Sequence, residues 1–131
     1  MRSAALLIVA ALANGGASPT HAAVAAPVTL PLKLGFYESP QCGQTYDVGG
    51  PLHLGKKGYS EDGDVTFVAV TLMGQNRYRV RTSSYDESNH RHYFWEVWQI
   101  LNATSFTRVG IGWSDPSAHT YRYCGPNEPA G

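Results

Sequence analysis

Three arginines alternate with uncharged residues in the segment Arg77-Tyr78-Arg79-Val80-Arg81-Thr82. Successive side chains of an extended strand point to opposite faces, so Arg77, Arg79 and Arg81 would share one face. A row of guanidinium groups can bind an anion or an acidic partner through charge-assisted hydrogen bonds. The row can also be a solvated outer face whose long stems cover the sheet. The acidic residues that could pair with it in that case are Asp86, Glu87 and Glu96.

The segment from His90 to Leu101 carries aromatic residues on both of its predicted faces. A strand with one solvated face alternates more sharply. Either both faces are covered by ordinary core packing, or one aromatic face lines a cavity or a docking surface. The candidate residues for such a pocket or docking face are Tyr93, Trp95, Trp98 and Trp113.

His90 and His92 would share one strand face and could hold a metal between them. The spacing defines no third ligand among His53, His119 and Glu96, so we predict no metal site and no cofactor. The sequence also lacks a nucleophile elbow, an H-E-x-x-H motif and a phosphate-binding glycine loop. We therefore predict no catalytic site.

The chain has two cysteines, Cys42 and Cys124, near the ends of its predicted β-domain. A bond between them would close a loop of about 80 residues and contribute roughly 4 to 5 kcal/mol in the chain-entropy model. Such a bond requires an oxidising compartment. We predict this disulfide, and the alternative is two separate buried thiols.

The first 25 residues have the pattern of a signal peptide. Met1-Arg2-Ser3 is a short positive region, and the apolar run from Ala4 to Ala13 is too short to span a bilayer. Ala23-Val24-Ala25 and Thr20-His21-Ala22 are both candidate cleavage sites, which places the cut within residues 22–26. No later segment is apolar enough to span a membrane. We predict export to the periplasm or the medium.

The formal net charge of the chain is +0, with ten basic and ten acidic residues. Arg2 is the one charged residue of the signal peptide, which leaves nine basic residues against ten acidic ones after cleavage. Binding to nucleic acid generally depends on a strong positive charge. We predict a protein or small-molecule partner and no nucleic acid.

Runs rich in β-branched and aromatic residues alternate with turn-forming residues throughout residues 26–125. The short connections favour antiparallel neighbours, and no helical period occurs. We predict an all-β antiparallel meander of about seven or eight strands in one domain, barrel-like or half-barrel, followed by a flexible tail at 126–131. The polar segment Lys56 to Asp64 is predicted as a loop, and Ser83 to Asn89 as a turn. The predicted strands are 34–38, 52–54, 65–72, 77–82, 90–101, 105–111 and 120–124.

The segments LPLKLGFY at 30–37 and YRYCG at 121–125 resemble small exported proteins of alphaproteobacteria. The resemblance implies the exported compartment and the bridge, but no function or site residue. Those relatives carry a second cysteine pair near the strands around Val65 and Ser83, which this chain lacks.

These features predict an exported binding or interaction domain, with an enzyme inhibitor as one form of it. The alternatives are a calycin-like carrier of small molecules and a structural envelope protein. A cavity of several hundred Å³ lined by Trp and Tyr would favour the carrier. A filled interior with an exposed patch of Arg and Trp would favour a protein partner.

Overall fold

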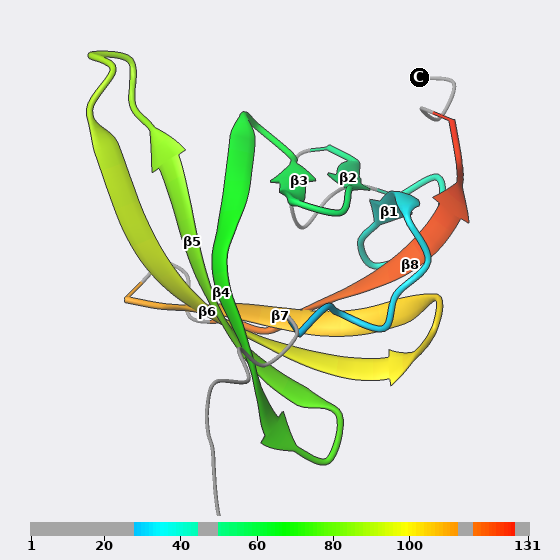
Figure 1. Ribbon diagram of the computed structural model, residues 1–131. Coiled ribbons are helices and arrows are strands. Elements are labelled where there is room, and N and C mark those ends of the chain that lie inside the picture. Colours follow the sequence, from blue (N-terminus) through cyan, green and yellow to red (C-terminus); the bar gives the residue numbers. More distant parts are fainter. Residues whose placement is uncertain (1–27, 45–49, 113–116, 128–131) are drawn as a thin grey trace, which may run out of the picture.

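The computed structural model describes residues 28–44, 50–112 and 117–127. Within them eight antiparallel strands pair in chain order, and β8 pairs with β1, so that the sheet closes into a barrel (Figure 1). The strands are β1 (Gly35–Glu38), β2 (Leu52–Leu54), β3 (Gly58–Ser60), β4 (Asp64–Gly74), β5 (Arg77–Tyr85), β6 (Arg91–Asn102), β7 (Ser105–Ile111) and β8 (His119–Gly125). The all-β prediction is confirmed, and the barrel is closed. The predicted signal peptide, Trp113 and the last four residues of the tail lie outside the described residues.

The turns of the two long hairpins fix how β4, β5 and β6 pair. Gln75 and Asn76 have φ angles of 53° and 60°, as a tight two-residue hairpin turn requires, and they join β4 to β5. At the next turn the Asp86 carboxylate accepts the N–H groups of Ser88 and His90, each at 2.9 Å. The predicted turn at Ser83–Asn89 therefore begins too early, because β5 continues to Tyr85.

The prediction of a loop at Lys56–Asp64 is wrong, because this segment contains β3. The strand has only three residues, too few to display a period of two, and it pairs with both β2 and β4. Gly58 is needed here because a Cβ atom at this position would meet the carbonyl oxygen of Val65. A glycine that reads as loop-forming in the sequence thus permits the close approach of two strands.

Stacked aromatic rings fill the interior of the barrel. The Trp98 ring stacks on Phe106 with centroids 4.5 Å apart, and Phe106 stacks on Tyr121 at 4.9 Å. Tyr37 contacts the Phe106 ring edge-on at 5.2 Å. All four side chains are fully buried. The large rings on the inner face of β6 and its neighbours therefore form a packed core.

The disulfide between Cys42 and Cys124 is present, with Cα atoms 5.6 Å apart, and confirms the predicted bridge. Cys124 belongs to β8, and Cys42 follows β1 in the chain. The bridge therefore lies next to the β1–β8 pairing that closes the barrel.

The buried phenol of Tyr37 should make the barrel less stable at alkaline pH. Burial, and to a lesser extent the nearby Tyr123, raise the pKa of Tyr37 to about 12, whereas an unfolded tyrosine ionises at about 10. The contribution of this phenol is complete below pH about 10 and is lost as the pH rises from there towards 12, by about 1.4 kcal/mol per pH unit. We expect Tyr37→Phe to make this dependence shallower in urea unfolding, and the part that remains to come from the buried Tyr59 and Tyr121.

The matched control for this prediction is Tyr85→Phe, because the Tyr85 side chain is 62% exposed. This variant should keep the alkaline loss of stability seen in the unchanged protein. Equal pH slopes for the two variants would contradict the assignment to Tyr37.

Candidate functional site

The outer face of the β5–β6 hairpin unites two sets of residues that the sequence suggested separately. In the register of the two strands, Arg81 lies opposite Trp95 and Ser83 lies opposite Tyr93. Side chains alternate along both strands, so the buried Tyr78 and Val80 point inwards and the arginines between them point outwards. We name the outer set the arginine–aromatic face; it consists of Arg79, Arg81, Arg91, Tyr85, Tyr93 and Trp95.

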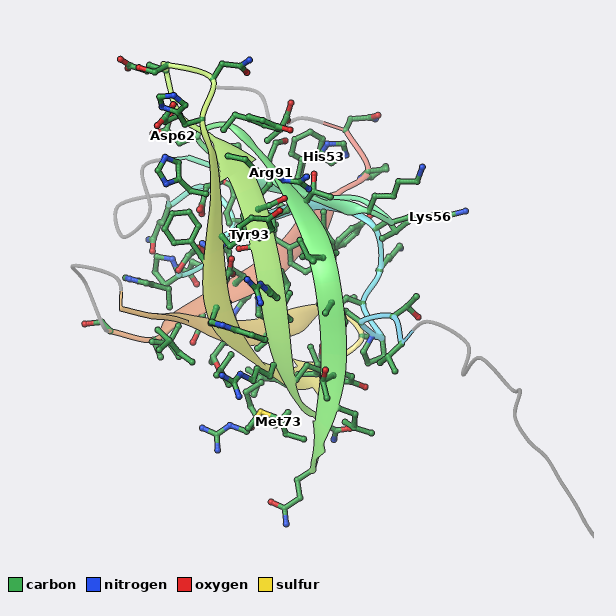
Figure 2. All side chains as sticks on the ribbon, turned by 60° about the vertical axis from the view of Figure 1, so that its left-hand side comes forward. His53, Lys56, Asp62, Met73, Arg91 and Tyr93 are labelled. Atoms are coloured by element: carbon green, nitrogen blue, oxygen red, sulfur yellow. A yellow bond between two sulfur atoms is a disulfide. The ribbon has the colours of Figure 1, made fainter. Side chains whose placement is uncertain are left out.

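Guanidinium groups and aromatic rings alternate along the arginine–aromatic face. The Arg79 guanidinium lies 4.1 Å from the centroid of Trp95, and that of Arg81 lies 5.0 Å from Tyr93 and 5.3 Å from Trp95. Arg91 lies 5.3 Å from Tyr93, and Figure 2 shows this pair on the hairpin. Each contact of this kind contributes about 0.5 to 1 kcal/mol at an exposed site. The contacts also restrict the orientation of the guanidinium groups.

Two of the acidic residues that could have neutralised this face, Asp86 and Glu96, are engaged elsewhere, and the third, Glu87, is exposed in the turn between β5 and β6. Asp86 accepts a hydrogen bond from the His92 ring at 2.7 Å. Hydrogen bonds from the His90 backbone and from His92 lower the pKa of Asp86. Glu96 lies inside the barrel. Among the described residues, no carboxylate forms an ion pair with the arginines of the face, and the buried Nε of Arg81 has no acceptor.

Trp98 and the remaining candidates lie apart from this face. Trp98 is fully buried in the core, because it lies three positions after Trp95 and so points to the opposite side of β6. Arg77 is exposed at the end of the row, opposite Gln99. Trp113 lies outside the described residues. The aromatic set suggested by the sequence is thus divided between the core and the outer face.

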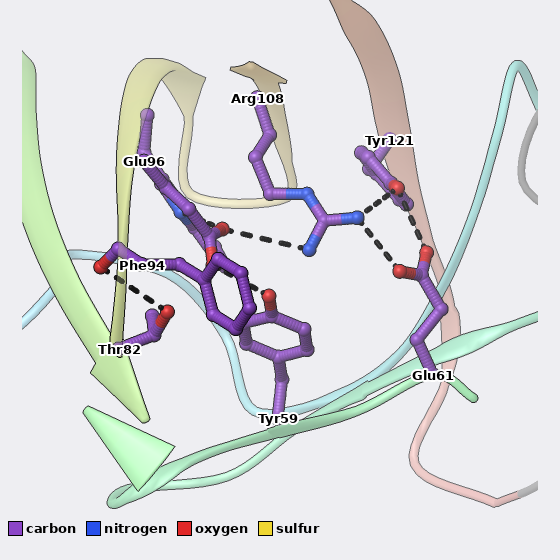
Figure 3. A network of polar contacts seen from close by, with 8 residues as sticks. Tyr59, Glu61, Thr82, Phe94, Glu96, Arg108 and Tyr121 are labelled. Atoms are coloured by element: carbon purple, nitrogen blue, oxygen red, sulfur yellow. Dashed lines mark hydrogen bonds and ion pairs between the residues drawn. The ribbon is translucent and has the colours of Figure 1, made fainter. Parts of the chain in front are cut away.

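Inside the barrel, a buried polar network forms around Arg108, which the sequence did not suggest as a site (Figure 3). A guanidinium nitrogen of Arg108 donates to Glu61 at 2.8 Å and to the Tyr121 hydroxyl at 2.6 Å. The Tyr121 hydroxyl donates in turn to the second oxygen of Glu61 at 2.8 Å. The other terminal nitrogen of Arg108 lies 3.6 Å from Glu96. One cation thus lies between two carboxylates.

Glu96 is satisfied by two further donors. The Tyr59 hydroxyl donates to one carboxylate oxygen at 2.6 Å, and the indole N–H of Trp98 donates to the other at 3.0 Å. Burial is the main cause that raises the pKa values of Tyr59 and Tyr121 above the ordinary tyrosine range. Burial lowers the pKa of Arg108, but the surrounding phenol and carboxylate oxygens outweigh it and raise the pKa overall. Arg108 therefore stays charged beside the carboxylates of Glu61 and Glu96, which suits a structural role.

One signal in the sequence could have revealed this network. Glu96 falls on the same predicted strand face as Trp98 and Ile100, so the alternation predicts a carboxylate that points into an apolar core. A buried carboxylate requires a cation or several donors. The sequence could not identify Arg108 as that cation, because the two residues belong to different strands.

The possible metal ligands are also placed by the structure. His90 and His92 both face Asp86, at 3.8 Å and 2.7 Å, on the exposed β5–β6 turn. The Glu38 carboxylate and the sulfur atoms of Cys42 and Cys124 lie within 4.8 Å of one another. Both sulfur atoms are bonded in the disulfide and are not available as thiolates.

No protein-family model, no curated protein and no solved structure matches this chain. Its resemblance to exported alphaproteobacterial proteins therefore stays a prediction. Among the described residues, no helix is long and apolar enough to span a membrane.

Proposed function

We propose that this protein is an exported binding domain that docks on an acidic protein surface through the arginine–aromatic face. The observation that carries the proposal is the row of guanidinium groups stacked on aromatic rings with no carboxylate of the described chain paired to it. The stacked core supports a docking domain over a carrier. A pocket of about 760 Å³ beside β4 is lined by neither Trp nor Tyr among the described residues.

The size of the face favours a protein over a small anion. From Arg79 to Tyr85 the strand rises by roughly 20 Å, at about 3.3 Å per residue. One phosphate or carboxylate would engage a single guanidinium of such a row, whereas several carboxylates on a protein surface can engage the whole row. Trp, Tyr and Arg are also the residues that dominate binding energy in protein interfaces. An enzyme with a cleft lined by carboxylates is one partner of this kind, and the domain would then act as its inhibitor.

The double variant Arg79→Ala/Arg81→Ala should weaken binding to an acidic surface at least tenfold. Each charge-assisted hydrogen bond contributes about 1.5 to 3 kcal/mol, and 1.4 kcal/mol corresponds to a factor of ten in affinity. A fluorescent peptide in which Glu and Leu alternate serves as the probe, measured by anisotropy at low and at physiological salt. A pull-down from the native envelope, made with the same variants, then identifies proteins that need the face.

Two variants separate the specific face from general positive charge. Arg122→Ala removes an exposed arginine of β8 and should change the affinity less than twofold. Arg79→Lys/Arg81→Lys keeps the charge but loses the planar fork, so its affinity should lie between those of the unchanged protein and the alanine variant. The proposal fails if the double alanine variant retains the same affinity and the same envelope proteins as Arg122→Ala.

A further inference from the structure

Strand β4 has an open edge along most of its length. On one side β4 pairs with β5 from Thr66 to Gly74. On the other side it pairs with β3 only from Asp64 to Thr66, and the Phe67 N–H then donates to the Lys57 carbonyl at 2.8 Å. Figure 1 shows that β4 continues well past the short β3. In the part of the chain that the structure describes, no strand pairs with this edge beyond Phe67, so its backbone groups can accept an added strand.

A preformed apolar groove of about 760 Å³ lies along this edge. Its volume falls within the usual range of ligand sites. Its rim carries three large apolar side chains that are about half exposed, Val28 at 44%, Leu34 at 43% and Val68 at 46%. Its other apolar lining residues include Leu30, Leu32, Leu54, Phe67 and Val70. Exposed apolar side chains gathered around a hollow are typical of a docking site.

The wall of the groove opposite β4 is anchored to the barrel. Lys33 donates its N–H to the Ala103 carbonyl at 2.8 Å, and the Tyr37 hydroxyl donates to the Lys33 carbonyl at 2.6 Å. Leu32 is 9% exposed and packs in the core. This wall is therefore ordered before a ligand binds, which lowers the free-energy cost of ordering the site on binding.

The charge of the groove is confined to one end. Among the described residues that line it, Lys56 and Lys57 are the ionisable ones, and both are exposed. The two lysines come directly before β3, where the chain turns away from the edge of β4. In Figure 2 the Lys56 side chain points away from the barrel, well separated from Met73 at the far end of β4. A ligand that complements this groove is apolar along its length and negatively charged at the lysine end.

We propose that an extended apolar peptide segment with an acidic C-terminal end adds to β4 as an antiparallel strand in this groove. Such a strand would lie in line with β3, beside the part of β4 that β3 does not cover. Because β4 runs from residue 64 to residue 74, the C-terminus of an antiparallel partner lies beside Lys57. A fatty acid would match the apolar lining and the lysines, but it would leave the backbone groups of β4 unpaired. The open edge therefore favours a peptide.

A synthetic heptapeptide, Thr-Val-Ile-Val-Thr-Val-Glu with a free carboxylate, tests the proposal by calorimetry and by NMR amide exchange. We expect binding that slows the exchange of alternate amide protons between Val68 and Gly74 and leaves β7 unchanged. Lys57→Glu should weaken binding at least fivefold, and so should a peptide with Gln and a C-terminal amide. Arg122→Glu is the matched control, with a change below twofold. Arg79→Ala/Arg81→Ala should bind the heptapeptide normally, which keeps this test independent of the arginine–aromatic face.

Four results would overturn the proposal. The first is slow exchange of these amides without peptide that increases with protein concentration, because a second copy would then cover the edge. The second is slow exchange at every concentration with no peptide binding, because the chain's own N-terminal residues would then fill the groove. The third is peptide binding without alternate protection. The fourth is binding of decanoate but not of the peptide, which would make the groove a carrier site.

Discussion

Replacement of Arg108 by methionine is expected to lower the free energy of unfolding by about 3 to 5 kcal/mol. Arg108 is 3% exposed, and the Glu96 carboxylate that it faces is 1% exposed. Methionine matches much of the length of the arginine stem but carries no charge. The variant leaves Glu96 buried without a cation, and the free energy of that uncompensated charge dominates the loss.

The hydrogen bonds that remain in this variant reduce the loss but do not remove it. Glu96 would still accept from Tyr59 and from the indole of Trp98. Glu61 is 18% exposed in its side chain and could recover water in place of the guanidinium. The Tyr121 hydroxyl keeps Glu61 as its acceptor. The penalty is therefore concentrated on Glu96, and a second substitution there should relieve part of it.

Urea unfolding followed by tryptophan fluorescence checks this prediction with a double-mutant cycle. Arg108→Met/Glu96→Gln should lower the free energy of unfolding by less than the sum of the two single variants. In the double variant neither residue of the pair is charged, so no buried charge is left without a partner. We expect an interaction energy within the range of about 0.5 to 3 kcal/mol known for contacting residues. Arg122→Met, on the exposed side of β8, should change stability by about 0.5 kcal/mol or less. A loss below about 1 kcal/mol for Arg108→Met, or full additivity, would contradict the structural role of the network.

The two faces of β6 explain why this strand shows no clean alternation in the sequence. Its outer face carries Tyr93 and Trp95 under the arginines of β5, and its inner face carries Glu96 and Trp98 in the core. A slip of one residue would place Trp95 in the core and Glu96 outside. Both faces would then lose their partners together, so the arginine–aromatic face and the Arg108 network specify the same register.

The sequence was informative where local signals are strong. The runs of β-branched and aromatic residues identified seven of the eight strands, and the short connections identified their antiparallel order. The missing strand, β3, is three residues long and is held by its neighbours on both sides. Closure of the barrel also depends on long-range pairing of β1 with β8, for which the two cysteines were the only indication.

The candidate site was predictable only in parts. Arg79 and Arg81 alternate along their own strand, and Tyr93 and Trp95 along theirs, so each row could be found separately. Their union depends on the register of β5 with β6, which the turn at Asp86 sets. The network around Arg108 could not be predicted in full, because Glu61 lies 47 residues away in the chain and no periodic pattern links them.

Removal of the disulfide in the variant Cys42→Ser/Cys124→Ser is expected to lower the free energy of unfolding by about 4.5 kcal/mol. The bridge joins residues 82 positions apart, so its loss frees nearly the whole domain in the unfolded state. A domain of this size commonly has a total stability of about 5 to 15 kcal/mol. The variant should therefore unfold at a much lower urea concentration than the oxidised protein.

The change should originate mainly in the unfolded state, because β1 and β8 remain paired through their backbones when the bridge is absent. The unfolded chain without the bridge is more extended, so the dependence of stability on urea should become steeper. The unchanged protein under reducing conditions should behave like the variant, and the oxidised protein provides the reference. A loss below about 1 kcal/mol in both reduced forms would show that strand pairing alone closes the barrel and that the loop entropy of the chain-entropy model does not apply here.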